Sequence, residues 1–515
     1  MLSGLNHQGK HMCGIAGIWG NVDEATVKQM LADQRHRGPD GQGVYVDVNR
    51  GVLGHTRLAI MDPAQGQQPL HNEARDATLV VNGMIYNYPQ LRRRLGQTHQ
   101  FGSNSDSETI LHLYEERGLA TPNSLDGMFA FAIIDDERLI LARDRIGIKP
   151  LYYGRKHTAS GTETLYFASE IKALAPLVQD VKEFPAGTIY DSASGFHTYY
   201  TVPNQIPLEL DLDTHLNRVR QTIEAAVKKR LLSDVPLGAF LSGGLDSSII
   251  AAVAKQYMPT LHTFSVGIEG SRDLEAARRV ARHIGSTHHE YVYRADEVIE
   301  TLPEIIYQLE SFDQDLVRSA IPTWFCARMA SERVKVILTG EGADELFAGY
   351  AYHKRITEYA ALHDELRRSV SRLHNINLQR VDRMTMRHGI EARVPFLDTD
   401  VIAMAQTVPP ELKLLTDPDG RRIEKWILRK AFEDLLPAEI VWRNKEQFDE
   451  GSGMTDLLPA IIEQATVGLD AKNYQTQFNA DRLRSREECF YHQVLRQQFA
   501  QPQAVLANVG RWSLD

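Results

Sequence analysis

The chain has 515 residues, three cysteines, and 57 Lys and Arg against 67 Asp and Glu, a formal net charge of −10. This length predicts roughly two to four domains, and the negative charge argues against nucleic acid as the main partner. Three cysteines are too few for a disulfide framework and suit a reducing, cytoplasmic setting, and the lack of any run of ~18 apolar residues predicts no membrane span.

Residues 1–12 are interpreted as a leader or vector-derived segment, because they lack the apolar stretch of a secretory signal. If Met12 is removed, Cys13 carries a free α-amine with a pKa of ~7.7–8.0. Such an amine can act as the general base for its own thiol. The alternative is an ordinary buried cysteine at the start of a strand, the role we expect of Cys326 and Cys489 as core residues.

Short apolar segments separated by Gly, Pro and Asp run through residues 13–200 and predict strands. Two segments with helical periodicity interrupt them, Glu24 to Gln34 and Ser107 to Arg117. Strand runs with two helices indicate stacked sheets covered by helices. Residues 202–214 are polar and aperiodic, which predicts a linker to a second domain.

Three side chains and one backbone amide in this first half are suited, with Cys13, to amide chemistry. Asn82 and Gly83 can each donate a hydrogen bond to a tetrahedral oxyanion. Arg57 is a cation at a strand end, and the carboxylate of Asp106 could hold an ammonium group. Each has a structural alternative, such as a turn, a helix cap or a surface charge.

Together these residues resemble the glutaminase domain of the class II, N-terminal-nucleophile amidotransferases. The resemblance implies an αββα sandwich with Cys13 as nucleophile, Arg57 binding the glutamine α-carboxylate and Asp106 its α-amine. Asn82 and Gly83 would form the oxyanion hole, whereas Met84 departs from the glutamate usual in the family. The motifs are Met12-Cys-Gly-Ile15, Arg35-His-Arg-Gly-Pro-Asp40, Asn82-Gly-Met-Ile-Tyr-Asn87, Ser105-Asp-Ser-Glu108, Asp126-Gly-Met-Phe-Ala-Phe131 and Arg143-Asp-Arg-Ile-Gly-Ile-Lys-Pro-Leu-Tyr-Tyr153.

After residue 214, helical patterns alternate with short apolar runs, which predicts βαβ units and a parallel sheet. The predicted strand Val235 to Leu241 is followed by Ser242-Gly-Gly-Leu-Asp-Ser-Ser248 and then a helix. The glycines allow close approach to an anion, and the helix N-terminus faces its charge. The stretch from Tyr350 to Asp515 is predicted to be mostly helical.

This loop resembles the pyrophosphate-binding loop of the ATP pyrophosphatases and implies ATP as substrate, pyrophosphate release and an acyl-adenylate. Asp246 and Asp344 are the candidate Mg²⁺ ligands, with Asp344 in Thr339-Gly-Glu-Gly-Ala-Asp-Glu345. The implied ATP-binding residues are Leu241, Ser242, Gly243, Gly244, Asp246, Ser247, Ser248, Val266, Thr339 and Gly340.

Charged residues farther along the chain are candidates for the second substrate. Lys445 and Glu341 are assigned catalytic roles, since a lysine near the α-phosphate can stabilise developing charge. A loop is predicted over Gly389 to Asp398. The residues assigned to the substrate carboxylate are Arg318, Glu341, Asp344 and Arg393.

The whole pattern over residues 12–455 resembles the glutamine-hydrolysing asparagine synthetases. It implies a glutaminase domain at 13–205 and a Rossmann-like α/β ATP-pyrophosphatase domain with a helical C-terminal part at 206–515. The implied reaction joins glutamine-derived ammonia to adenylated aspartate through an internal tunnel, in a homodimer. The segment Gln314 to Arg318 departs from some members, so the acceptor could instead be another small carboxylic acid. The sequence also leaves open a ring-closing enzyme related to β-lactam synthetase and a catalytically inactive scaffold.

Overall fold

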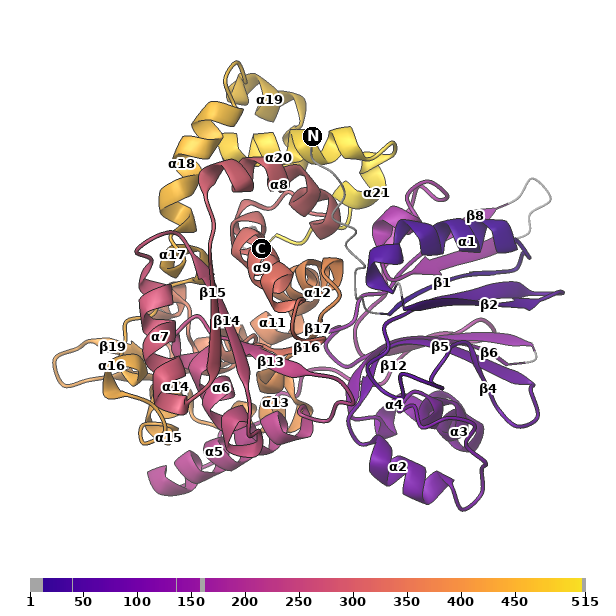
Figure 1. The fold of residues 1–515 in the computed structure, drawn as a ribbon, viewed down its shortest axis with the longest axis horizontal. Helices are drawn as coiled ribbons and strands as arrows, with labels where there is room; N and C mark the ends of the chain where they lie inside the picture. The colour runs from indigo at the N-terminus through magenta and orange to yellow at the C-terminus, as the bar shows by residue number, and fades with distance from the viewer. Residues whose placement is uncertain (1–12, 39, 136, 158–162, 512–515) are drawn as a thin grey trace.

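The structure, a computed structural model, describes residues 13–38, 40–135, 137–157 and 163–511; the predicted leader, residues 1–12, lies outside this range. The chain forms a sandwich of strands, indigo to purple in Figure 1, beside a larger body of helices around a sheet, magenta to yellow. No described helix combines the length and apolarity needed to cross a bilayer. Cys326 and Cys489 are buried, as predicted, whereas Cys13 is half-buried.

The first half contains two six-stranded antiparallel sheets, ordered β10-β8-β9-β1-β3-β2 and β12-β11-β7-β6-β5-β4. The strands of the first sheet are β1 Gly14–Trp19, β2 Gly41–Asp47, β3 Gly51–Arg57, β8 Tyr152–His157, β9 Glu163–Ala168 and β10 Val181–Glu183. Those of the second are β4 Leu70–His71, β5 Ala77–Ile85, β6 Gly127–Asp135, β7 Arg138–Arg143, β11 Thr188–Asp191 and β12 Gly195–Thr198.

The two sheets stack on apolar side chains that alternate along their strands, including Ile15, Leu53, Val80 and Phe167. Helix α1 (Glu24–Asp33) covers one sheet, and α2 (Tyr88–Leu95), α3 (Glu108–Arg117) and α4 (Thr121–Ser124) cover the other (Figure 1). The predicted αββα sandwich is therefore confirmed. Helix α2 was not predicted, because its eight residues include three consecutive arginines and bury only Leu91 and Leu95.

The second half is built on a five-stranded parallel sheet, ordered β15-β14-β13-β16-β17, as predicted. Alternate residues of β16 enter different cores: Val336 and Leu338 pack with α5, α6 and α7, whereas Ile337 packs with α8, α9 and α12. The strands are β13 Leu237–Phe240, β14 His262–Gly267, β15 Thr287–Val292, β16 Val336–Leu338 and β17 Glu391–Arg393, and the helices are α5 Leu212–Lys229, α6 Leu245–Tyr257, α7 Arg272–Ile284, α8 Ala295–Leu309, α9 Gln314–Ala330 and α12 Asn377–Arg387.

The remainder is mostly helical, as predicted, with one two-stranded sheet of β18 (Leu414–Thr416) and β19 (Arg422–Glu424). Its helices are α10 Ala343–Phe347, α11 Tyr359–Ser371, α13 Thr399–Gln406, α14 Pro410–Lys413, α15 Trp426–Ala431, α16 Ala438–Val441, α17 Phe448–Gly451, α18 Met454–Ala465, α19 Ala471–Gln477, α20 Arg486–Gln498 and α21 Pro502–Leu506.

Two predicted boundaries are wrong. The last residues of the predicted linker form the first turn of α5, because the side chain of Asp211 accepts a hydrogen bond from the Thr214 amide and caps the helix. The predicted loop over Gly389 to Asp398 contains β17, the fifth strand of the sheet. Its three residues carry two charges, so only its pairing with β16 identifies it as a strand.

A cluster of buried charges joins the two halves. The Arg37 guanidinium is fully buried and lies 2.7 Å from Glu170 and 2.8 Å from Asp382. Lys172 pairs with Glu170 at 2.7 Å, and Arg383 with Glu310 at 2.9 Å. The sandwich thus supplies two cations and one anion, and the larger half supplies one cation and two anions. Opposite charges therefore meet across the boundary.

We expect Arg37→Met to lower the free energy of unfolding by about 3–5 kcal/mol, because it leaves Asp382 and Glu170 with less positive charge in a buried site. Chemical denaturation of the full chain measures this loss. Lys28→Met is the matched control: it also removes one positive charge, from an exposed pair with Glu24, and should cost ~0.5 kcal/mol or less. Equal losses in the two variants would contradict the role of the cluster.

Candidate active sites

A small cavity of about 30 Å³ lies where the sandwich meets the second half, and all five residues predicted to bind or react with glutamine line it. They come from separate elements: Cys13 precedes β1, Arg57 ends β3, and Asn82 and Gly83 lie in β5. Asp106 precedes α3. The volume is about that of one water molecule, so glutamine can enter only if neighbouring side chains or loops move.

Cys13 is held by the backbone around it. Its thiol donates to the Leu58 carbonyl at 3.7 Å and its sulfur accepts from the Leu58 amide at 3.5 Å. Arg37 Nε donates to the Cys13 carbonyl at 3.2 Å. Burial raises the pKa of the thiol to about 11, so it needs a base at neutral pH. None of the described residues lining this cavity is a histidine. An α-amine on Cys13 is therefore the candidate for that base.

Asn82 presents an unused donor. Its Nδ2 is buried and lacks a hydrogen-bond partner among the described residues, a state that costs about 1–3 kcal/mol. An oxyanion in the cavity would accept this hydrogen bond.

Arg57 and Asp106, the two residues predicted to bind the glutamine α-carboxylate and α-amine, form hydrogen bonds with backbone groups in this structure. Arg57 donates to the carbonyls of Asp62 at 2.6 Å and Pro63 at 3.0 Å. Asp106 accepts from the Ile85 amide at 2.8 Å. Burial, with a contribution from the charge of Glu391, raises the pKa of Asp106 to about 6.

Glu391 is a residue of this cavity that the sequence did not predict. It belongs to β17 of the parallel sheet, is 3% exposed, and lines the same cavity as Cys13 and Met84. Arg393 Nε donates to Glu391 Oε1 at 2.8 Å. The cavity therefore has a carboxylate from the second half, Glu391, beside Met84 from the first half.

Because Asp106 must be ionised to hold an ammonium group, we expect the Kd for glutamine to rise about tenfold per pH unit below about pH 6. Calorimetric titration of glutamine into Cys13→Ala protein, which cannot turn glutamine over, measures this dependence. Glu391→Gln in that background removes a like charge, lowers the pKa of Asp106 and should move the onset to lower pH. A Kd that is constant between about pH 5 and about pH 7.5 would refute the assignment of Asp106.

A second cavity, about 520 Å³, lies at the carboxyl ends of β13, β14 and β16, where open α/β sheets bind ligands. The predicted residues that line it are Leu241, Ser242, Gly244, Asp246, Ser247, Thr339, Gly340, Glu341, Asp344 and Lys445. Its volume is in the range that accepts a nucleotide-sized ligand.

The loop after β13 is shaped to receive an anion. Ser242 Oγ accepts from the Gly244 amide at 3.2 Å, and Ser247 Oγ accepts from the Ser242 amide at 3.2 Å. Gly243 has φ +74°, and a Cβ there would lie 2.5 Å from Ala276, so glycine is required. Helix α6 begins at Leu245, and residues of its first turn line the cavity. The backbone N–H groups at a helix N-terminus are suited to bind an anion.

Two aspartates of this cavity share one lysine that the sequence did not predict. Lys425 Nζ lies 2.6 Å from both Asp246 Oδ2 and Asp344 Oδ1. Lys445 Nζ lies 2.9 Å from Asp344 Oδ2. Although burial raises the pKa of Asp344, these two ammonium groups outweigh it and hold that pKa below its ordinary value. Lys425 has φ +55°, a backbone strain that often marks functional sites.

The aspartate pair also fits a divalent cation. Asp246 Oδ1 is buried and lacks a hydrogen-bond partner among the described residues. Aspartate carboxylates are the oxygen ligands that Mg²⁺ uses beside nucleotide phosphates. Mg²⁺ bound here would neutralise phosphate charge.

Two residues assigned to the substrate carboxylate are not brought into this cavity. Arg318 pairs with both carboxylate oxygens of Glu487, at 2.9 and 2.6 Å. Arg393 is fully buried and donates to Glu391 and to the carbonyls of Arg230 and Leu232. Their spacing in the sequence could not reveal these partners.

Three residues of the predicted ATP site lie behind the cavity wall: Gly243, Ser248 and Val266 do not line the cavity, and Val266 packs in a hydrophobic core. By contrast, Arg380 on α12 lines the cavity and pairs with Glu341. It was not predicted, and it is the better-placed guanidinium for a substrate carboxylate.

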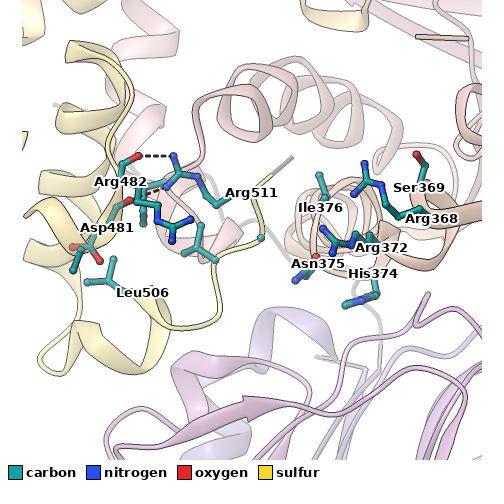
Figure 2. A pocket seen from close by; sticks show the side chains of 14 residues that line it. Arg368, Ser369, Arg372, His374, Asn375, Ile376, Asp481, Arg482, Leu506 and Arg511 are labelled. Carbon is teal, nitrogen blue, oxygen red and sulfur yellow. Dashed lines mark hydrogen bonds between the residues drawn. The ribbon is translucent and has the colours of Figure 1, made fainter. Parts of the chain in front are cut away.

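A third cavity, about 420 Å³, contains none of the predicted site residues. Figure 2 shows its arginines, with Arg511 donating to the carbonyls of Asp481 at 2.9 Å and Arg482 at 3.4 Å. It lies next to the last described residue and shares Ile376 with the wall of the large cavity.

Two protein families match successive parts of the chain. The glutamine amidotransferase domain family matches residues 12–203, and the asparagine synthase family matches residues 218–359 and 354–515. A glutamine-hydrolysing asparagine synthetase of Arabidopsis thaliana is 42% identical over 86% of this chain and 79% of its own. Asparagine synthetase B of Escherichia coli is 37% identical over 96% of this chain and 92% of its own. A maize (Zea mays) asparagine synthetase is 38% identical over 96% and 87%.

Proposed function

Because the chain belongs to the family of glutamine-hydrolysing asparagine synthetases, we propose that its two cavities perform the two halves of one ligase reaction. Residues 13–205 release ammonia from glutamine, and residues 206–515 use ATP to attach it to aspartate. The products are asparagine, glutamate, AMP and pyrophosphate. A cytoplasmic homodimer, implied by the family resemblance, belongs to the same proposal.

In the small cavity, the Cys13 thiolate attacks the side-chain amide of glutamine. Asn82 Nδ2 and the Gly83 amide donate to the oxyanion as it forms. Arg57 and Asp106 hold the α-carboxylate and α-ammonium groups. Ammonia then leaves, and water hydrolyses the γ-glutamyl thioester to glutamate. When Met12 is removed, the α-amine of Cys13 takes the thiol proton.

In the large cavity, the Ser242–Ser248 loop binds the pyrophosphate portion of ATP. The β-carboxylate of aspartate attacks the α-phosphorus, pyrophosphate leaves, and β-aspartyl-AMP forms. Asp246 and Asp344 would hold Mg²⁺, which supplies charge neutralisation on the phosphates. Lys425 and Lys445 add positive charge where the phosphates lie. Ammonia then attacks the acyl carbon and releases AMP.

One observation carries the proposal: the strand pair β16–β17 reaches both cavities. Glu391 lines the small cavity, and two residues later the Arg393 carbonyl accepts from the Thr339 amide at 3.0 Å, in the wall of the large one. An apolar cluster that includes Leu58, Met84 and Leu241 also extends from one site to the other. Ammonia that passes among these packed apolar side chains would be kept from water, so it would stay unprotonated and nucleophilic.

Cys13→Ala separates the two half-reactions. We expect it to abolish asparagine formation from glutamine while free ammonium still supports synthesis, because only the first site loses its nucleophile. Product analysis by chromatography, with wild-type protein beside the variant, measures both rates. Equal loss with the two nitrogen sources would contradict separate sites. Absence of product from the wild type with either source would favour an inactive scaffold.

Asp315 and Leu316, which depart from some members of the family, line the large cavity where the acceptor would bind. We expect AMP and asparagine when protein, glutamine and ATP are supplied with aspartate. Arg380→Gln should raise KM for aspartate about tenfold or more with little change in KM for ATP. Absence of both products, with AMP appearing for another small acid or for ring closure, would overturn aspartate as acceptor.

A further inference from the structure

Four side chains gather on the helical face of the sandwich, outside the cavities described above: Glu73, His99, His112 and Glu115. They come from three segments. Glu73 lies in the turn between β4 and β5, His99 lies after α2, and His112 and Glu115 lie one turn apart on α3. One nitrogen or oxygen atom of each lies within 4.8 Å of the others.

The histidine–carboxylate distances are close to those of a tetrahedral metal site. His99 Nδ1 lies 3.5 Å from Glu73 Oε1 and 3.6 Å from Glu115 Oε2. His112 Nδ1 lies 3.6 Å from the other Glu73 oxygen, Oε2, and 2.9 Å from Glu115 Oε2. Metal–ligand bonds of ~2.0–2.2 Å in a tetrahedron place neighbouring ligand atoms about 3.3–3.6 Å apart. Small shifts of these side chains would therefore bring their nitrogen and oxygen atoms to metal-binding distances.

Surrounding groups hold these ligands in place. Glu73 accepts from the Gln100 amide at 2.7 Å, and Glu115 accepts from Asn72 Nδ2 at 2.9 Å. On the far side of the His112 ring, Nε2 lies 3.5 Å from Glu108. A carboxylate behind a metal-binding imidazole is the usual arrangement of metal sites, because it fixes the ring and raises its basicity.

Ion pairing alone explains the cluster less well. The two imidazole rings stack with centroids 4.7 Å apart, so protonating both would place two positive charges face to face. A metal ion lets both rings stay neutral and still bind between two carboxylates. Two imidazole nitrogens exclude Mg²⁺ and Ca²⁺ as the preferred ions and favour Zn²⁺.

We propose that Glu73, His99, His112 and Glu115 form a structural Zn²⁺ site. Four protein ligands close the coordination shell, as in structural rather than catalytic zinc sites. The ion would tie the β4–β5 turn and the segment after α2 to helix α3. Because Asp106 lies two residues before the start of α3, the same ion would steady the side of the small cavity where we propose that glutamine binds.

Titration of ZnCl₂ into chelator-treated full-length protein tests the site, with His99→Ala as the variant because its side chain is 15% exposed and not part of the core. His157→Ala is the matched control: His157 also lies beside a glutamate, Glu163, but its side chain is 68% exposed. We expect the wild type and His157→Ala to bind one more zinc equivalent than His99→Ala. Glu73→Gln should lose the same equivalent.

Two further readouts distinguish this site from zinc bound elsewhere. Zinc should raise the melting temperature of the wild type but not of His99→Ala, because a ligand stabilises the folded state that binds it. Co²⁺ in place of zinc should give the intense visible absorption of a tetrahedral site. Equal zinc equivalents in wild type and His99→Ala, or a zinc-independent melting temperature in both, would overturn the proposal.

Discussion

The buried contact between Arg37, Glu170 and Asp382 is the constraint on which the rest of the structure depends. A reaction split between two sites requires that the sites keep a fixed distance and orientation. Burying six charges at the boundary makes any other docking of the halves costly, because displaced charges would lose their partners without regaining water. The same guanidinium of Arg37 also donates to the carbonyl of Cys13. The contact that docks the two halves therefore also positions Cys13.

Strand β17 then brings the two sites together. Its first residue, Glu391, supplies a carboxylate to the small cavity, and its last, Arg393, pairs through its backbone with Thr339 of the large cavity. A shift of this strand of even one residue would exchange which side chains face each site. The position occupied by Met84 in this chain is therefore best understood together with Glu391, which supplies negative charge from across the boundary.

The sequence predicted those features that local patterns determine. The sandwich, the parallel sheet and the serine–glycine loop follow from strand alternation and from glycines at a strand end, and Cys13, Asn82 and Asp106 share one cavity as expected. Lys425, Arg380 and Glu391 were missed because their roles depend on contacts with residues far away in the chain. Arg318 and Arg393 were assigned to a substrate carboxylate because arginine can bind one. In the structure their guanidinium groups pair with the buried carboxylates of Glu487 and Glu391 and do not line the large cavity.

In the proposed reaction, ammonia passes within the protein from Cys13 to the adenylate. This transfer is tested most directly by supplying glutamine labelled with ¹⁵N in its amide together with excess unlabelled ammonium at saturating glutamine, and measuring the isotope content of asparagine by mass spectrometry. If transfer is internal, the fraction of asparagine that carries ¹⁵N should far exceed the fraction of ¹⁵N in the nitrogen supplied as glutamine amide and ammonium together. Asparagine labelled only in proportion to the mixed ammonia pool would contradict internal transfer.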